Sequence, residues 1–507
     1  MRLQILLTTV VLISALCSAC SGSKNCLNST FANIAVSYSM AGQNDQALQA
    51  AQRITLLTRK ADVLSLIALQ AAKAGQEKQS ANLFNQALQA ANKIEPSPDK
   101  VMALEAIASR YGRIGQKDKA AEVLAQALQD TKAIWGTSFV KDTVLEKIAV
   151  NYAQLGDYTQ GIQVTNKIVE DIPKSRALAR IVAYYVAAGE YDQARQIANT
   201  IEVQTSQANA LIEIAEKTGE YQQALTVAKE IDEEERALWK SIILGKITLL
   251  YSKAGQNKQA DETLSQAIKA AQNIEGTDAQ LNQLTRIGFL YIEMEKQEQA
   301  IKLASQTLQV VNQIQDIYKK AVLLANIAVV YGKAGKKELA DSVFAQAIKV
   351  ARTLNNEDKK TQTLAEISIN YAKVNPYNQV LQLTQTIGNA KTQAYALSKI
   401  ARDYEKAGDK EQGVQALDQA FQIAQTIETT QGKSQKLAEI AVQLGRLAQY
   451  DRAIAIAQTL DATEKDSPKA SALAQIANYC AKAGQQEKAI ALLSQALQAA
   501  NTTQCSD

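Results

Sequence analysis

Histidine is absent from the 507-residue chain, and this removes most of the catalytic chemistry that side chains support. Without His there is no imidazole general base, no Ser-His-Asp or Cys-His nucleophile pair and no His-ligated metal. Five Cys are present, and the one Cys-x-x-Cys spacing, Cys17 to Cys20, lies near the N-terminus. We therefore expect no metal site, no cofactor and no enzymatic activity.

Two further kinds of chemistry are also not expected. Gly432-Lys433-Ser434 ends like a phosphate-binding loop, but that pattern needs Gly where Ile427 stands, and a strand where this sequence is helical. The charge is balanced, with 55 Lys and Arg against 51 Asp and Glu, and has no long run of one sign. A nucleic-acid-binding surface leaves a denser basic footprint, so we expect no nucleic-acid partner.

Residues 1–19 have the features of a secretory signal peptide. Arg2 precedes an apolar run from Leu3 to Leu16, which is too short to span a membrane comfortably. Ser18-Ala19-Cys20 resembles the end of a bacterial lipobox, in which lipid is attached to the Cys after the cleavage point; Cys17 stands where that pattern usually has Leu. Two outcomes stay open. Either Cys20 is lipidated and residues 20–27 form a flexible tether, or cleavage after Ala19 leaves a chain without lipid. Both predict export: the lipidated chain would stay at the cell envelope, in the periplasm or on the outer surface, and the chain without lipid would be a soluble secreted protein.

Beyond residue 27 the sequence repeats one pattern: Tyr, three residues, Gly, four residues, Ala. Clear copies contain Tyr111 with Gly115 and Tyr331 with Gly335. We call the place of this Gly the turn position. Aligning it gives thirteen copies, with turn positions 42, 75, 115, 156, 189, 219, 255, 295, 335, 375, 408, 448 and 484.

Each copy predicts a helical hairpin. Leu, Ile and Tyr at spacings of three and four form one apolar stripe on a first helix, and Gly ends that helix in the left-handed conformation. A second stripe with small Ala residues follows on a second helix. Ten turn positions are Gly; Glu295, Asn375 and Ala448 occupy the others. Where turn positions lie 40 residues apart, we expect a longer second helix or a longer turn into the next hairpin. Between Gly156 and Gly255 we expect shorter second helices.

These spacings resemble the tetratricopeptide repeat, with Ile where the family usually has Leu, and with most of the terminal Pro missing. The resemblance covers about residues 28–501. It implies an all-α fold: a right-handed α-solenoid of about 13 hairpins, or about 26 helices, with more than one superhelical turn. No linker interrupts the repeats, so we expect residues 28–507 to form a single superhelical domain.

The resemblance also implies where a ligand would bind. In this family ligands lie in a concave groove against the first helices, close to the Tyr position. Two residues before that position stand mostly apolar side chains, among them Phe289, which imply an apolar floor. Two residues after it stands a basic stripe: Lys73, Arg113, Lys217, Lys253, Lys333, Lys373, Lys406, Arg446 and Lys482.

Such a groove would suit an extended or helical segment that carries acidic groups. Two structural explanations stay open beside this one. Basic residues near a helix C-terminus complement the helix dipole, and the apolar floor can be core between hairpins.

We therefore expect a non-catalytic scaffold at the bacterial cell envelope that binds other proteins or peptides. The carboxylate clamp of chaperone-binding family members needs Asn at the first of the two groove positions, and only Asn478 meets this. The alternative is a module for envelope glycan or peptidoglycan, although only Trp135 and Trp239 add to the Tyr and Phe that could stack on sugars.

The last copy raises two further expectations. Cys480 takes the place of its Tyr, and we expect a small buried side chain or, as the alternative, a disulfide to Cys505. No polar capping helix is expected after this copy. Its end face would then be open to an end-to-end homodimer, and the two ends of the solenoid would stay apart.

Overall fold

The computed structural model describes residues 26–134, 138–464 and 467–503. In these residues the chain forms 26 α-helices and two short 3-10 turns, without a strand. A first and a second helix flank every one of the thirteen turn positions, so the predicted all-α solenoid of helical hairpins is confirmed. The signal peptide, Cys20 and Cys505 lie outside the described residues. Contacts divide the chain into two compact units.

Unit 1 comprises the residues up to Leu155 and those from Tyr404 onward. Its N-terminal helices are α2 (Cys26–Met40), α3 (Asn44–Gln52), α4 (Leu57–Lys73), α5 (Glu77–Asn92), α6 (Pro98–Arg113), α7 (Lys117–Asp130) and α8 (Ser138–Gln154). Its C-terminal helices are the end of α22 (Ala390–Lys406), then α23 (Lys410–Gln425), α24 (Thr430–Arg446), α25 (Tyr450–Gln458), α26 (Pro468–Lys482) and α27 (Gln486–Thr502).

Unit 2 runs from Gly156 to Asp403. Its helices before the last one are α9 (Tyr158–Thr165), α10 (Asp171–Ala188), α11 (Tyr191–Ala198), α12 (Gln204–Thr218), α13 (Gln222–Glu230), α14 (Glu233–Lys253), α15 (Asn257–Gln272), α16 (Thr277–Glu293), α17 (Gln297–Val310), α18 (Ile317–Lys333), α19 (Lys337–Arg352), α20 (Glu357–Tyr371) and α21 (Tyr377–Thr384). Most of α22 completes the unit.

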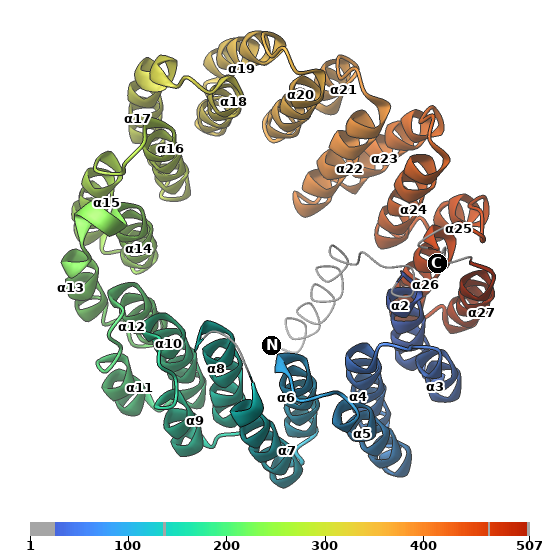
Figure 1. Ribbon diagram of the computed structural model, residues 1–507. Coiled ribbons are helices and arrows are strands. Elements are labelled where there is room, and N and C mark those ends of the chain that lie inside the picture. Colours follow the sequence, from blue (N-terminus) through green and yellow to red (C-terminus); the bar gives the residue numbers. More distant parts are fainter. Residues whose placement is uncertain (1–25, 135–137, 465–466, 504–507) are drawn as a thin grey trace. The chain divides into compact units, whose positions relative to one another are not determined.

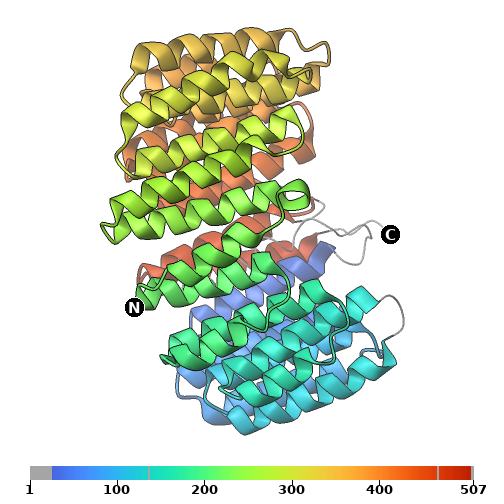
Figure 2. The same cartoon turned by 90° about the vertical axis from the view of Figure 1, so that its left-hand side faces the viewer.

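Each unit has two layers, one of first helices and one of second helices (Figure 1). In unit 2, α10 contacts α12, α12 contacts α14, and this continues through α16 and α18 to α20. Second helices contact the first helix of the next hairpin, as α15 does with α16. Seen from the side, the green-to-yellow helices of this unit are stacked with their long axes roughly parallel (Figure 2). Each hairpin thus buries its apolar stripes against its neighbours, as a repeat unit must.

The length of the second helix follows the interval between turn positions. In the 40-residue intervals, α5, α15, α19 and α23 each have 16 residues, and α17 has 14 residues followed by the 3-10 turn Val311–Gln313. Between Gly156 and Gly255, α9 and α11 have 8 residues and α13 has 9. The prediction of shorter second helices in this block is confirmed, and the additional residues elsewhere lengthen the helix.

Left-handed backbone occurs at twelve of the thirteen turn positions, including the two non-glycine positions Glu295 (φ 57°) and Ala448 (φ 63°). A side chain in this conformation strains the backbone. Asn375 is the exception, because Pro376 follows it and favours extended backbone in the residue before it. The turn geometry therefore comes from the helix–turn–helix arrangement, and Gly at the turn position only lowers the backbone strain.

Exchanging Gly and Ala at turn positions should change stability in opposite directions. We expect Gly335→Ala to destabilise the chain by about 1 kcal/mol and Ala448→Gly to stabilise it by a similar amount. A Cβ at Gly335 would meet no atom within 4 Å, so the effect reports backbone strain alone. Urea denaturation followed by circular dichroism measures both. Ala125→Gly, at an exposed position inside α7, is the control and should cost about 1 kcal/mol. Equal losses for Ala448→Gly and Ala125→Gly would contradict the prediction.

Within unit 1 the last hairpin packs against the first. Helix α2 contacts α26 and α27 on one side and α4 on the other, and it buries Phe31, Ile34 and Tyr38. The side-chain amide of Gln486 at the start of α27 donates a hydrogen bond to the carbonyl oxygen of Ala41, at 2.6 Å. We call this contact the terminal joint. No peptide bond links its two sides directly.

The terminal joint corrects two predictions. The end face of the last hairpin is not open, because α2 covers it, and the end-to-end homodimer loses the basis on which it was expected. The two ends of the described chain also meet. Cys480 is free and fully buried in α26, as predicted for a small packing residue.

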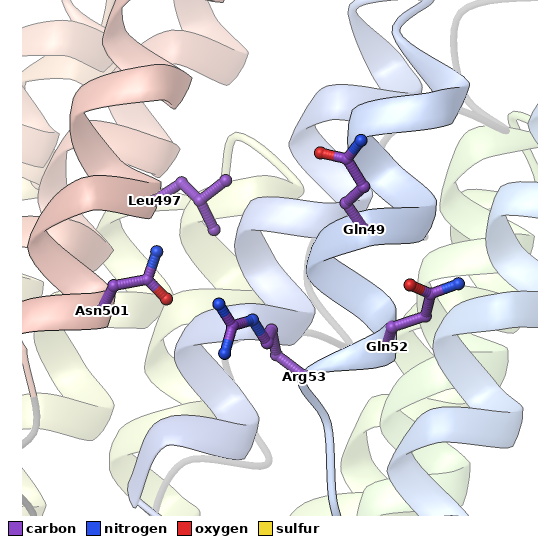
Figure 3. A pocket seen from close by; sticks show the side chains of 5 residues that line it. All are labelled: Gln49, Gln52, Arg53, Leu497 and Asn501. Atoms are coloured by element: carbon purple, nitrogen blue, oxygen red, sulfur yellow. The ribbon is translucent and has the colours of Figure 1, made fainter.

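A polar pocket lies where the second helices border the terminal joint. Gln49, Gln52 and Arg53 line it from the end of α3, and Leu497 and Asn501 line it from α27 (Figure 3). Polar side chains on both sides fit a region that stays hydrated. The apolar contact of the terminal joint therefore runs mainly through α2.

Candidate interaction surface

The predicted basic stripe lies at the C-terminal ends of the first helices. Seven of its nine residues are the last residue of their helix, Lys217 is the penultimate residue of α12, and Lys373 lies two residues after α20. All are exposed except Arg446, which is partly covered and forms an ion pair with Glu405. In this position they complement the helix dipoles and also leave positive charge on the open surface of the first-helix layer.

The terminal joint gathers the basic stripe of unit 1 from both ends of the chain. First helices contact one another in the order α24, α26, α2, α4, α6. Their ends therefore carry Arg446, Lys482, Met40, Lys73 and Arg113 in that order. Sequence alone placed Lys482 and Lys73 at opposite ends of the solenoid, whereas the fold leaves only one helix between them.

The surroundings of two members of this row, Lys73 and Lys482, perturb their protonation. Partial desolvation, and secondly the positive charge of Arg113, lower the pKa of Lys73. Desolvation also lowers the pKa of Lys482. The pKa of Lys73 is lower in the folded chain than in the unfolded chain. At pH values between these two pKa values, the unfolded chain therefore binds more protons than the folded chain. The contribution of Lys73 to stability therefore rises as pH increases through the range.

Removing the neighbouring charge should raise the pKa of Lys73. In Arg113→Gln we expect this pKa to move toward its ordinary value without reaching it, because desolvation remains. An NMR titration of the Lys73 side chain measures the change. Lys482 is the internal control, because Arg113 is not among the causes of its shift. An unchanged pKa of Lys73 would show that the two charges do not interact.

In unit 2 the structure brings two predicted residues together. Phe289 is half-buried on α16, and the Lys333 ammonium at the end of α18 lies 6.0 Å from the centroid of its ring. This distance is within the range of a cation–π contact. Lys217 and Lys253 lie at the ends of their own first helices and Lys373 lies just after α20, with Glu293 at the corresponding place on α16.

The predicted apolar floor divides into two kinds of residue. Leu69, Val150 and Val329 are buried between hairpins and belong to the core. Phe289 and Leu249 remain partly accessible. The explanation of the floor as core thus holds for the first group only.

Sequence reasoning missed exposed apolar side chains at the opposite ends of four of the first helices. The residue 17 places before the turn position is Phe139, Ile172, Leu238 or Tyr318 on α8, α10, α14 and α18, and each is exposed. Trp239 follows Leu238 and is 56% exposed. The recurrence at one position could have been found in the sequence, but apolar residues in an amphipathic helix are ordinarily assigned to the core.

Comparison with known proteins identifies one repeat directly. The family model for the tetratricopeptide repeat matches residues 321–354, which hold most of α18 and all of α19. The same helix–turn–helix arrangement occurs at thirteen turn positions, so the chain is a helical repeat protein that contains a tetratricopeptide repeat. This class of fold serves protein–protein interaction. Among the described residues no helix has the length and apolar character needed to cross a membrane.

Other comparisons give only distant likenesses. No curated protein sequence is significantly similar to the chain. Ton1535 from Thermococcus onnurineus NA1 is 16% identical over 71% of this chain and 95% of its own, with a TM-score of 0.28. The apo form of the quorum sensor NprR from B. thuringiensis is 13% identical over 71% of this chain and 97% of its own, with a TM-score of 0.26. The apo form of RapI is 13% identical over 79% of this chain and 97% of its own, with a TM-score of 0.28.

Proposed function

We propose that the protein is a non-catalytic interaction scaffold at the bacterial cell envelope, which binds acidic segments of partner proteins on the open surface of its first helices. The observation that carries the proposal is the row of exposed basic residues at the ends of these helices. In this proposal residues 1–19 direct export and are removed, and lipid on Cys20 holds the protein at the membrane through residues 20–27.

The basic row favours acidic partners for an electrostatic reason. Charged groups on one surface steer a partner of opposite sign and suppress partners of the same sign. Each contact at an exposed lysine contributes little by itself, so binding depends on several in a row. Affinity should accordingly fall as the salt concentration rises.

Photo-crosslinking in intact cells tests the binding surface. A photoreactive residue replaces Lys253 or Lys333 on the first helices, and the matched controls replace the exposed Lys269 on α15 or Lys302 on α17. We expect discrete crosslinked proteins from the first-helix positions and none of them from the controls. The same products from all four positions would contradict the proposed surface, and crosslinks to peptidoglycan fragments in place of proteins would favour the glycan alternative.

Mass spectrometry of the mature N-terminus tests the location separately. We expect a chain that starts at Cys20 and carries the mass of attached lipid. A chain that keeps residues 1–19 would overturn export. A chain that starts at an unmodified Cys20 would overturn the lipid anchor and leave the scaffold proposal standing.

A further inference from the structure

Helix α14 exposes one stripe of side chains, and this stripe carries both apolar and basic residues. From Ala237 to Lys253, most positions are buried. The accessible stripe includes Trp239, Ile242, Lys246, Leu249 and Lys253. Steps of three and four place these five on one face of the helix. The 14 helical steps from Trp239 to Lys253 span about 21 Å at 1.5 Å per residue.

The two neighbouring first helices extend this surface. Helix α14 contacts α16, and α16 contacts α18. Gly245 and Gly288 permit this packing, because a Cβ at Gly245 would lie 2.9 Å from Leu290 and one at Gly288 would lie 3.3 Å from Val330. We define the α14–α18 face as the accessible residues Trp239, Lys246, Lys253, Arg286, Phe289 and Lys333.

The α14–α18 face combines basic and aromatic side chains. It has four basic and two aromatic side chains, with Glu293 as an interruption at the end of α16. Lys246 is held in place by a 2.8 Å hydrogen bond to the side-chain oxygen of Asn209 on α12. One exposed tryptophan needs no explanation. Here, however, it shares one open stripe with basic residues, and exposed apolar residues recur at the starts of other first helices.

We propose that the α14–α18 face binds an amphipathic acidic segment, with a large apolar side chain against Trp239 and carboxylates reaching Lys253, Arg286 and Lys333. The inference rests on the proposed function and narrows its partner. The 21 Å between Trp239 and Lys253 correspond to about 14 residues of helix or about six residues of extended chain. Tryptophan and arginine are the side chains that most often dominate binding at such surfaces, because they combine large contact area with a polar group.

Synthetic peptides of 16 residues test the proposal on the full chain. One carries Phe and Leu at one end and Glu at the other. A second keeps only the acidic end, a third keeps only the apolar end, and a fourth has the composition of the first in mixed order. The chain carries Trp135→Phe, so that Trp239 is its single tryptophan and reports binding by fluorescence. Isothermal titration calorimetry measures the affinities.

The two-part peptide should bind at least about tenfold more tightly than any of the others. Trp239→Ala, followed by calorimetry, should reduce its affinity to that of the acidic peptide and leave the acidic peptide unaffected. The double variant Lys253→Gln and Lys333→Gln should weaken the binding of the two-part peptide and of the acidic peptide. Lys269→Gln with Lys302→Gln changes the charge equally on the second helices and should weaken neither.

The outcomes separate this inference from the proposed function. If the acidic peptide binds as tightly as the two-part peptide and Trp239→Ala has no effect, the inference is wrong and the basic surface stands. Failure of every peptide to bind also overturns the inference, whereas the crosslinking result decides the proposed function independently. Equally tight binding of heparin or oligo(dT), lost in the same lysine variants, would show a general polyanion surface and would overturn it as well.

Discussion

Removing the first hairpin is expected to loosen the last hairpin, more than 400 residues away in the sequence. Without residues 26–53, α26 and α27 lose the contact with α2 and their apolar side chains become exposed. Each large apolar side chain that leaves the core costs about 1.5–3 kcal/mol. We therefore expect amide hydrogen exchange in α26 and α27 to become at least about tenfold faster, which corresponds to about 1.4 kcal/mol. Mass spectrometry of peptides from these helices measures the change.

Other helices provide the controls for this deletion. Exchange in α4 should also become faster, because α4 packs against α2 in any solenoid. Exchange in α18 and α19 of unit 2 should not change. Gln486→Ala is a milder variant that removes one hydrogen bond of the terminal joint, and it should cost about 0.5–1.5 kcal/mol. If α4 is loosened while α26 and α27 keep their exchange rates, the terminal joint does not exist in solution.

Truncating Phe84 is expected to cost about 3–5 kcal/mol. This side chain on α5 is fully buried and stacks on the ring of Tyr111 of the next hairpin, with centroids 4.0 Å apart and an angle of 19° between the planes. Phe84→Ala therefore leaves a cavity and removes an aromatic contact between hairpins. Urea denaturation measures the loss. Because stability in a repeat protein is a sum of hairpin and interface contributions, we expect the single transition to separate into two.

Phe84→Leu is the matched control, since it keeps most of the buried volume. It should cost no more than about 1.5 kcal/mol and keep one transition. Unit 2 offers a second comparison at the corresponding positions, where Phe344 of α19 contacts Tyr371 edge to face with centroids 4.9 Å apart. Similar losses for Phe84→Ala and Phe84→Leu would contradict the prediction, because they would assign the cost to the lost aromatic contact and not to the cavity.

Most of the hairpin architecture could be predicted from the sequence because it depends on local features. Apolar spacing fixes which face of a helix is buried, and the turn positions mark where first helices end. Even Glu295 and Ala448, which disagree with the preference for Gly, were placed correctly by alignment with the other copies. The interval between turn positions predicted the short second helices α9, α11 and α13, because residues between two fixed turns must be accommodated in that helix.

The candidate surface was predictable only in part. A basic residue at the end of a first helix is exposed by its position, so Lys253 and Lys333 could be chosen from the sequence. Apolar residues were ambiguous, because an amphipathic pattern does not show whether a neighbouring hairpin covers them. Val329 proved to be buried and Phe289 partly accessible, although both occupy the same place in their helices. Trp239 is 56% exposed, which its place in an amphipathic helix did not reveal.

The sequence by itself determined thirteen helical hairpins, their turns, and an open row of basic side chains, because each of these follows from residues a few positions apart. Only the tertiary structure decided that α2 covers α26 and α27, which places Lys482 one helix away from Lys73. Hairpins with similar stripes can stack on many partners, and no local pattern specifies which distant hairpin will be the neighbour. That choice depends on how small rotations between successive hairpins accumulate along the chain.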